Sequence, residues 1–350
     1  MICQSIKREQ WVDKLKNKLL KVPYVHVTFT LPHQLNGLAR LNQKLIYAMI
    51  MKASWLTIQE VMTAINATAG MTSVLHTFGS DMKYHIHAHC LVTFGGLNKQ
   101  GKWQYPTDKY KLAKYRIICA TFKSIFMQLL EQAYQNNEVI YHEDCSALTK
   151  ELIKLRWVVN STRPTIDTSL IENYLARYIN RIAVSNNRLK YIIETKKVVI
   201  LYNDYKQQKT GEAAPKAIKN LTPLVAIDQI LQHVLPRHFQ KSRSFGLHHA
   251  CNKLKSKAEN ALKNNSNTIR TLFEIISHLM GLEKMKCSEC QCEDFEIETI
   301  QPDKKFIQKF LTLHSNKSPP NQTQHIASNP PYCQENAPTS KVKAMYQFQK

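Results

Sequence analysis

The chain contains no apolar run of about 18 residues, which is the length that a membrane-spanning helix needs. Its start, MICQSIKREQ, lacks the apolar core of a secretion signal. Its nine cysteines are mostly not spaced in pairs, which fits a reducing compartment better than a disulfide scaffold. These absences predict a cytoplasmic protein without a membrane span. Because 350 residues exceed what a single core usually buries, we expect two or more structural units.

Acidic residues are also scarce, with 26 Asp and Glu against 48 Lys and Arg and a formal net charge of +22. A chain this basic is expected to bind a polyanion. The excess concentrates in residues 171–260, which hold 16 basic and 6 acidic residues. Basic surface with aromatic rings suits single-stranded nucleic acid, although a merely solvated basic face would share this composition. The interleaved rings are Tyr191, Tyr202, Tyr205, Phe239 and Phe245.

Three histidines alternate within an otherwise apolar segment, residues 84–94. Successive side chains of a strand point to opposite faces, so His85, His87 and His89 share one face, with neighbours about 7 Å apart. Two imidazoles at that spacing can converge on one metal ion. A buried polar stripe is costly unless its groups are paired or bound to something. The segment therefore predicts a metal-binding strand, and the alternative is a set of satisfied core or edge histidines.

A pair of tyrosines is the second chemical feature. Ser169 followed by Glu172 is a capping-box pattern, so we expect a helix from near Leu170. Tyr174 and Tyr178 lie four residues apart and share one helical face. Phenol is a poor nucleophile unless a metal or base activates it or its target. Near a metal and a basic surface the pair suggests attack on phosphate, whereas taken alone it is more typical of packing.

The remaining pattern predicts an α+β fold, an antiparallel sheet with helices on one face. In this arrangement the sheet holds the histidines rigidly, and the tyrosine helix presents its phenols from across a groove. We expect helices over residues 1–22, 36–69, 108–136 and 224–234, and strands over residues 25–31, 72–77, 84–94, 157–159, 191–193 and 197–202.

Together these motifs resemble the two-tyrosine, HUH-type (histidine–hydrophobe–histidine) rolling-circle insertion-sequence transposases. The resemblance covers roughly residues 20–255 and rests on several blocks in order. An opening strand, KVPYVHVTFTLPH, comes first, and HTFGSDMKYHIHAHCLV contains the histidines. The later blocks are Trp157-Val158, residues 174–188, YNDYK at 202–206, QHVLPRHF at 232–239 and RSFG at 243–246.

The resemblance implies roles for particular residues. His87 and His89 would be the metal pair, His85 stands where such proteins often have another histidine, and Tyr174 and Tyr178 would be the nucleophiles. It further implies Mg²⁺ or Mn²⁺ with a third, unplaced ligand, and cleavage of single-stranded DNA at element ends and target through a 5′-phosphotyrosine. In the basic region we predict DNA contacts from Arg177, Arg181, Arg188, Lys190, Arg237, Lys241 and Arg243.

The two ends of the chain differ from the family pattern. Full-length members carry a cysteine-rich zinc-binding segment before the opening strand, and here only Cys3 remains, so we interpret residues 1–22 as a truncated, basic helical remnant. Residues 23–255 would form the nuclease domain, and residues 256–315 a helical C-terminal region. Residues 316–350, rich in Pro, Asn, Gln, Ser and Lys, are predicted to be a disordered tail.

Three further cysteines have the spacing of a zinc knuckle but lack an obvious second pair, so structural Zn²⁺ is one interpretation of Cys287, Cys290 and Cys292.

The central Ala88 of the histidine motif is smaller than the usual branched residue, but no ligand is lost.

Three other functions remain open from the residues. A replication initiator or relaxase would use the same chemistry. A His-x-His metal hydrolase usually needs ligands from a repeated strand–helix barrel, and that repeat is absent. An inactive DNA-binding remnant of a mobile element would keep the basic surface without catalysis.

Overall fold

The protein is described here from a computed structural model. Contacts divide the chain into two compact units, residues 1–269 and residues 270–350. The first unit contains the strands that carry the predicted metal-binding histidines. The predicted boundaries at residues 22, 255 and 315 stay predictions. The structure describes residues 2–17, 19–140, 145–166, 184–205, 207–209, 212–249, 251, 253–262, 271–280, 295–297 and 340–342.

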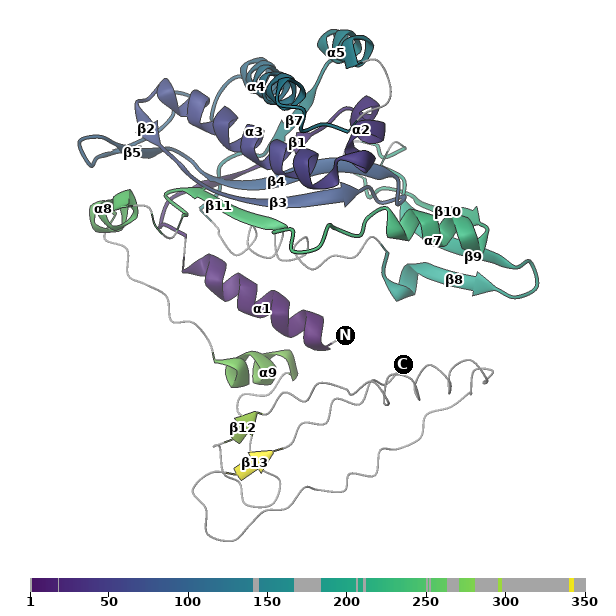
Figure 1. The fold of residues 1–350 in the computed structure, drawn as a ribbon. Helices are drawn as coiled ribbons and strands as arrows, with labels where there is room; N and C mark the ends of the chain where they lie inside the picture. Colours follow the sequence, from purple (N-terminus) through teal and green to yellow (C-terminus); the bar gives the residue numbers. More distant parts are fainter. Residues whose placement is uncertain are drawn as a thin grey trace. The chain divides into compact units, whose positions relative to one another are not determined.

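A five-stranded antiparallel sheet forms the centre of the first unit, in the order β11-β3-β4-β1-β7 (Figure 1). β3 and β4 form a hairpin, and β4 and β1 are also directly paired, so two strands flank the histidine strand. The alternating residues of β1 and β4 place apolar side chains on one face and polar ones on the other. The strands are β1 (Tyr24–Thr30), β3 (Gly70–Phe78), β4 (Tyr84–Thr93), β7 (Val158–Ser161) and β11 (Ser242–Gly246).

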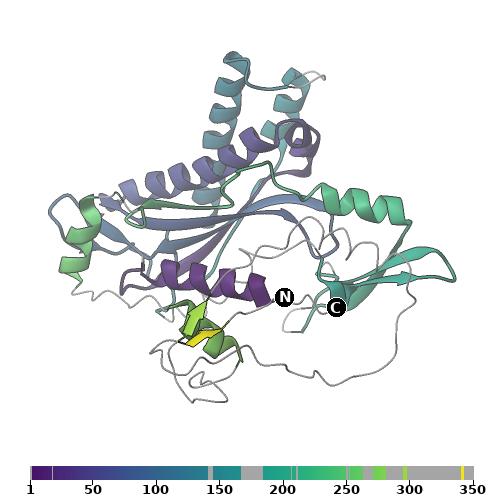
Figure 2. The same cartoon turned by 60° about the horizontal axis from the view of Figure 1, so that its bottom comes forward.

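Helices α3 (Gln43–Thr63) and α4 (Tyr115–Gln135) cover the apolar face of this sheet (Figures 1 and 2). Their buried residues join those of the strands in the main core. The α+β prediction with helices on one face is thereby confirmed. The core residues that the strands contribute to this face include Val25, Val27, Phe29, Ile86, Ala88, Cys90 and Val92.

The histidine face becomes apolar at one end of the sheet. There Val74 and Leu91 pack with Leu15 of α1 (Ile2–Lys16) and Ala258 of α8 (Lys253–Ala261). The same strand face therefore changes from histidines to a second hydrophobic cluster. Among the described residues this cluster covers one end of the face, and the histidines lie at the other end.

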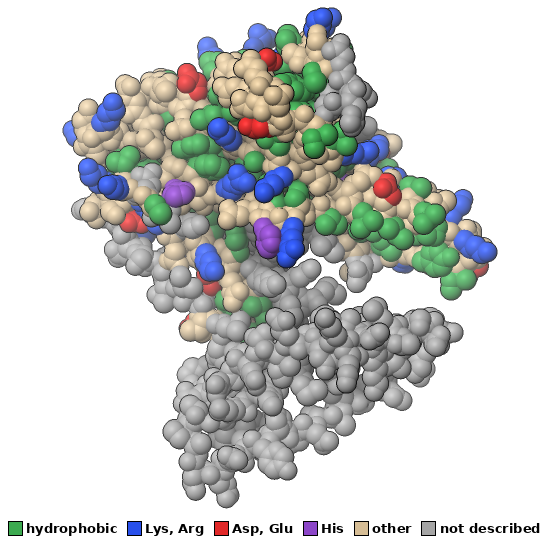
Figure 3. Space-filling view, viewed as in Figure 1, with side chains coloured by type: hydrophobic (Ala, Val, Ile, Leu, Met, Phe, Trp, Pro, Cys, Tyr) green, Lys and Arg blue, Asp and Glu red, His purple; other side chains and the backbone are tan. Residues whose placement is uncertain are grey.

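A smaller sheet, order β10-β9-β8, extends from the β3–β4 turn. Its core joins Phe78 and Met82 to Val198 and Ile200 of β9 and Ala226 of α7. Figure 3 shows apolar side chains gathered over α7, and Lys and Arg outnumbering Asp and Glu on the face in view. The predicted hairpin is confirmed as β8 (Leu189–Ile192) and β9 (Lys197–Asn203), followed by β10 (Lys216–Leu221) and α7 (Pro223–Leu231).

Two predicted helices were too long. The helix predicted over residues 36–69 is divided into α2 (Asn36–Leu41) and α3, and the chain then turns at Asn66, whose φ is 49°. The helix predicted from residue 108 begins only at Tyr115. The Asp108 carboxylate accepts the backbone N–H of Tyr110 at 2.8 Å, and such a local bond favours a turn over a helix.

The remaining elements are short. α1 ends at Lys16, earlier than the predicted residue 22, and the described helices include none that is both long and apolar enough to cross a membrane. In the second unit, two strands pair in parallel. These elements are η1 (His33–Leu35), β2 (Ala67–Thr68), β5 (Gly96–Asn98), β6 (Trp103–Gln104), α5 (Cys145–Lys154), η2 (Asn186–Arg188), α9 (Leu272–Met280), β12 (Phe295–Ile297) and β13 (Ser340–Val342).

Candidate metal centre

Three buried histidines meet on the polar face of the sheet. His76 comes from β3, and His87 and His89 come from β4; their side chains are 2%, 8% and 5% exposed. The strand register pairs His76 directly with His87, and His89 follows two residues along on the same face. One ligand nitrogen from each ring lies within 4.8 Å of the others. Three imidazole nitrogens this close together could hold one metal ion.

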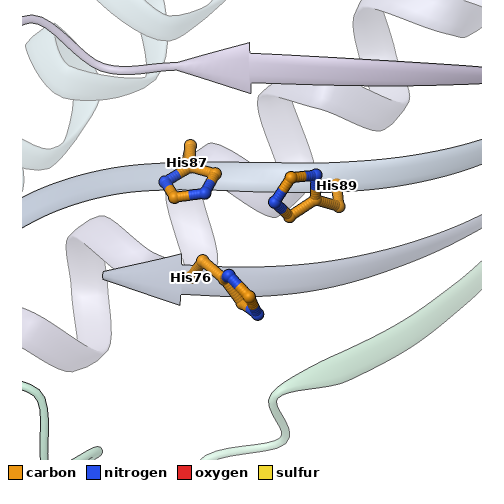
Figure 4. A group of neighbouring side chains, drawn as sticks. All are labelled: His76, His87 and His89. Atoms are coloured by element: carbon orange, nitrogen blue, oxygen red, sulfur yellow. The ribbon is translucent and has the colours of Figure 1, made fainter. Parts of the chain in front are cut away.

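The three rings meet edge to face and do not stack. Ring centroids are 5.4 Å apart for His76 and His87, 5.0 Å for His76 and His89, and 4.7 Å for His87 and His89, with interplanar angles of 76–86°. Figure 4 shows a nitrogen of each ring turned towards the space between the three. Rings at these angles can aim lone pairs at a common point, which parallel stacked rings cannot.

A second layer of groups orients two of these rings. Nδ1 of His87 lies 2.9 Å from the carbonyl oxygen of His85 and can donate to it, which leaves Nε2 as the ligand atom. Nδ1 of His89 lies 3.1 Å from Nε2 of His26 and 3.4 Å from Oγ1 of Thr28. Burial lowers the pKa of His26 to about 4, so this supporting ring is neutral at pH 7.

These donors fit a divalent transition metal. Imidazole nitrogen suits Mn²⁺ and later metals better than Mg²⁺, which prefers oxygen. Three protein ligands also leave coordination positions for water or a phosphate oxygen. Among the described residues this is the one group of three or more His, Cys, Asp or Glu side chains with such geometry.

The sequence did not reveal His76 as the third histidine of this cluster: the third ligand was left unplaced, and His85 was considered for it. The structure places the exposed His85 side chain outside the cluster, although its ring centroid is 4.9 Å from that of His87. A signal for His76 was present. It lies at the end of the predicted strand before the turn at residues 79–81, and a hairpin across that turn pairs it with His87.

Polar side chains continue the face towards the sheet edge. Thr28 and Thr30 of β1 lie opposite His89 and His87, and Asn160 of β7 lies opposite Thr28. Partners in register share a face, so these hydroxyl and amide groups surround the histidines on the β7 side. The face offers hydrogen-bonding groups beside a metal site.

The predicted DNA-contacting residues lie in different places. Arg188 is half-buried, and it donates from Nε to the Leu201 carbonyl at 2.7 Å and from Nη2 to the Ser80 carbonyl, so it ties the small sheet to the β3–β4 turn. Lys190 and Arg237 are exposed.

Arg243 and Lys241 belong to the helix-covered side of the sheet. Arg243 pairs in register with Ser73, three residues from His76, so it lies on the face opposite the histidines. Its guanidinium lies 5.3 Å from the ring centroid of Phe239, and burial lowers its pKa. Lys241, half-buried, precedes β11, and its carbonyl accepts the N–H of Leu75. The other predicted site residues lie outside the described part of the chain, namely Tyr174, Arg177, Tyr178, Arg181, Cys287, Cys290 and Cys292.

The chain matches two known protein families. A family described as "Putative transposase" matches residues 70–256, more than half of the chain. The chain belongs to this transposase family. A second family, "Transposase zinc-binding domain", matches residues 1–31 of the chain. The resemblance to insertion-sequence transposases is confirmed, and the interpretation of residues 1–22 as a truncated remnant of the zinc-binding segment stays a prediction.

Two curated relatives are similar to this chain over most of its length. "Putative transposase y4qJ" of Sinorhizobium fredii (strain NBRC 101917 / NGR234) is 30% identical over 256 residues, which are 70% of this chain and 63% of that protein. The transposase for insertion sequence element IS801 of Pseudomonas savastanoi pv. phaseolicola is 26% identical over 267 residues, 75% of this chain and 63% of the relative. The chain thus spans less than two thirds of either relative. No solved structure matches it.

Proposed function

We propose that this transposase cuts and rejoins single-stranded DNA with a tyrosine nucleophile beside a divalent metal held by His76, His87 and His89. One observation carries the proposal: three buried histidines from two paired strands bring ligand nitrogens within 4.8 Å on a polar face. The net charge of +22 supports a polyanionic partner. The family match supports DNA as that partner.

The histidines would hold the ion, and the second layer would keep their rings in place. When bound, Mn²⁺ or Mg²⁺ would polarise the scissile phosphate and offset the negative charge that develops on it. The all-nitrogen set favours Mn²⁺ of the two. The carbonyl of His85 and the ring of His26 fix the orientations of His87 and His89, which lowers the cost of ordering them on binding.

The nucleophile would be the hydroxyl of Tyr174 or Tyr178, both within the family match. Its oxygen forms a bond to phosphorus and gives up its proton, while the bond from phosphorus to the 3′ oxygen breaks and that oxygen gains a proton. The products are a 5′-phosphotyrosine and a free 3′-hydroxyl. Because the phosphotyrosine ester conserves the free energy of the broken phosphodiester, rejoining needs no nucleotide cofactor. The second tyrosine allows a second strand to be cut while the first stays attached.

Covalent capture tests this proposal directly. The full chain is incubated with a pool of randomised single-stranded oligonucleotides labelled at the 3′ end, and the protein is run on a denaturing gel. A labelled adduct should form with Mn²⁺ and disappear with a chelator. The His87→Ala/His89→Ala and Tyr174→Phe/Tyr178→Phe proteins should give none, and each single Tyr→Phe protein should give some.

A matched control is the Tyr191→Phe/Tyr202→Phe protein, which alters two tyrosines of the small sheet and should keep the full adduct yield. Peptide mapping identifies the attacked residue. A label on Tyr191, Tyr202 or Tyr205 would overturn the assignment of the nucleophiles. Intact DNA binding with no adduct under any metal would indicate a DNA-binding protein without strand transfer.

A further inference from the structure

Two exposed tyrosines near the edge of the main sheet each carry a cation beside the ring. Arg163 lies 5.4 Å and Lys109 lies 5.0 Å from the ring centroid of Tyr110. Arg156 lies 5.7 Å from the ring centroid of Tyr115. The tyrosines are 49% and 39% exposed, so the rings remain accessible beside their cations. We call these five residues the edge strip.

The edge strip borders the strand that ends the sheet. Arg156 and Arg163 come just before and just after β7, which is paired only with β1 in the five-stranded order. Neighbouring strands are about 4.8 Å apart, so β7 lies roughly 10 Å from β4 and its histidines. Asn160 of β7 and Thr28 of β1 lie on the histidine face between the two. The edge strip therefore lies at one edge of the sheet that carries the histidines.

The surroundings of the edge strip are strongly basic. Residues 99–116 contain six Lys and Arg and a single acidic residue, Asp108. The Asp108 carboxylate is engaged by the backbone N–H of Tyr110 at 2.8 Å. Arg156 and Arg163 add two more cations to this segment. The segment lies outside residues 171–260, where the sequence composition predicted the basic surface.

We propose that the edge strip is a second single-stranded DNA-binding surface, on which bases stack on Tyr110 and Tyr115 while Lys109, Arg156 and Arg163 neutralise phosphates. Exposed rings with adjacent cations supply the two contacts that single strands use, base stacking and backbone attraction. In a duplex the base faces are already stacked on one another, so the aromatic part of this surface favours single strands. The inference takes only the identity of the polymer from the proposed function, because binding here requires neither metal nor nucleophile.

Equilibrium binding of a fluorescent single-stranded oligonucleotide to the full chain, with a chelator present, tests the stacking. The Tyr110→Ala/Tyr115→Ala protein should lose roughly 5- to 150-fold in affinity for each stacked base. The Tyr110→Phe/Tyr115→Phe protein keeps both rings and should bind like the unaltered chain. All variants should keep the same melting temperature, because both side chains are exposed. Unchanged affinity of the alanine protein, or equal losses for single strand and duplex, would overturn the proposal.

The salt dependence tests the cations. Each phosphate contact adds about −0.7 to the slope of log K against log salt for single strands, so Arg156→Gln/Arg163→Gln should make the slope shallower by about 1.4. Lys44→Gln/Lys52→Gln removes the same charge from exposed positions on α3 and should leave the slope unchanged. Equal changes in both proteins would refute the assigned contacts.

These readouts are separate from strand cleavage. The His87→Ala/His89→Ala protein should form no covalent adduct, and adding Tyr110→Ala/Tyr115→Ala to it should lower single-strand affinity by the same factor as in the unaltered chain, measured with chelator. If the nucleophile assignment fails, the binding and salt-dependence experiments still test the edge strip. If edge-strip binding fails while the adduct forms, this inference alone is wrong.

Discussion

At the residue scale, the proposed chemistry depends on histidines that come from two strands. His87 and His89 are separated by one residue, but their partner His76 lies eleven positions before His87. Neighbouring residues decide how useful each imidazole is. The His85 carbonyl and the His26 ring engage the nitrogens that face away from the cluster, so a ligand nitrogen of each β4 histidine faces it.

Replacing His76 by Ala should weaken Mn²⁺ binding at least 10- to 100-fold. Loss of a group that merely orients a metal ligand already lowers metal affinity by that factor, and loss of a ligand itself should lower it at least as much. Replacing the neighbouring His85 by Ala is the matched control and should change affinity less than twofold, since its carbonyl, which contacts His87, is retained. Titration of the metal-free protein with Mn²⁺ gives both constants. A larger effect of the His85 substitution would place the third ligand at His85.

A buried pair of tyrosines should make the stability of the protein depend on pH in the alkaline range. The hydroxyls of Tyr47 and Tyr84 are 2.6 Å apart, and burial raises the pKa of both. Because the folded-state pKa values exceed the unfolded value near 10, the stability that the pair contributes is complete below about pH 10 and is lost as pH rises further. The unfolding free energy should therefore fall above that pH.

Ultraviolet titration at alkaline pH should show Tyr47 and Tyr84 ionising after the exposed tyrosines. The Tyr47→Phe/Tyr84→Phe protein removes both hydroxyls together and leaves no buried partner unsatisfied, so it should lose part of the alkaline destabilisation. Ionisation of all tyrosines in one step near pH 10 would contradict the prediction.

At the element scale, α4 attaches the helical layer to the sheet through aromatic packing. Phe122 is fully buried and its ring centroid lies 4.9 Å from that of Phe29 on β1 and 5.5 Å from that of Trp157. The sheet that carries the histidines is thus supported from behind by side chains of α4. Packing on the face opposite the histidines therefore holds the candidate metal site rigid.

Phe122→Ala should lower the unfolding free energy by about 3–5 kcal/mol, since it leaves a cavity in this core. Ile117→Ala, on the same helix but 51% exposed, is the control and should change it by about 0.5 kcal/mol or less. Denaturant unfolding measures both. Similar losses for the two proteins would show that α4 does not pack as described.

The end of β11 depends on a glycine. Gly246 has φ of +56°, and a Cβ there would lie 2.0 Å from the Ala69 carbonyl oxygen and 2.4 Å from the Trp55 ring. Gly246→Ala should therefore destabilise the protein by at least about 1–2 kcal/mol. Gly37→Ala, in α2 with nothing within 4 Å, should instead stabilise it by up to about 1 kcal/mol. Opposite signs in thermal unfolding are the expected result.

At the scale of the whole molecule, the charge excess should control DNA affinity. With about six phosphates contacted, the slope of log K against log salt for single strands should be close to −4. Fluorescence anisotropy between low and moderate salt measures it. A slope near zero would show that the +22 charge is solvated and not used for binding.

Local patterns in the sequence were enough to predict much of the secondary structure of this protein. Alternation of apolar and polar residues predicted the β1 and β4 strands, the hairpin of the small sheet and the helical layer, because the period of a strand or a helix is a local property. The same alternation predicted that His87 and His89 share a face. The helix start at Tyr115 could not be predicted in this way, because the Asp108 turn competes with an otherwise helical pattern.

Only the tertiary structure decided which distant residues complete each site. His76 joins His87 and His89 because the hairpin register aligns β3 with β4, and His26 reaches His89 because β1 pairs with β4 on the other side. Arg163 meets Tyr110 across 53 positions of sequence, which no local period encodes. The sequence by itself determined the family, the strand with its histidines and the basic charge. Strand pairing, a long-range choice governed by packing of the whole core, determined the histidine cluster and the edge strip.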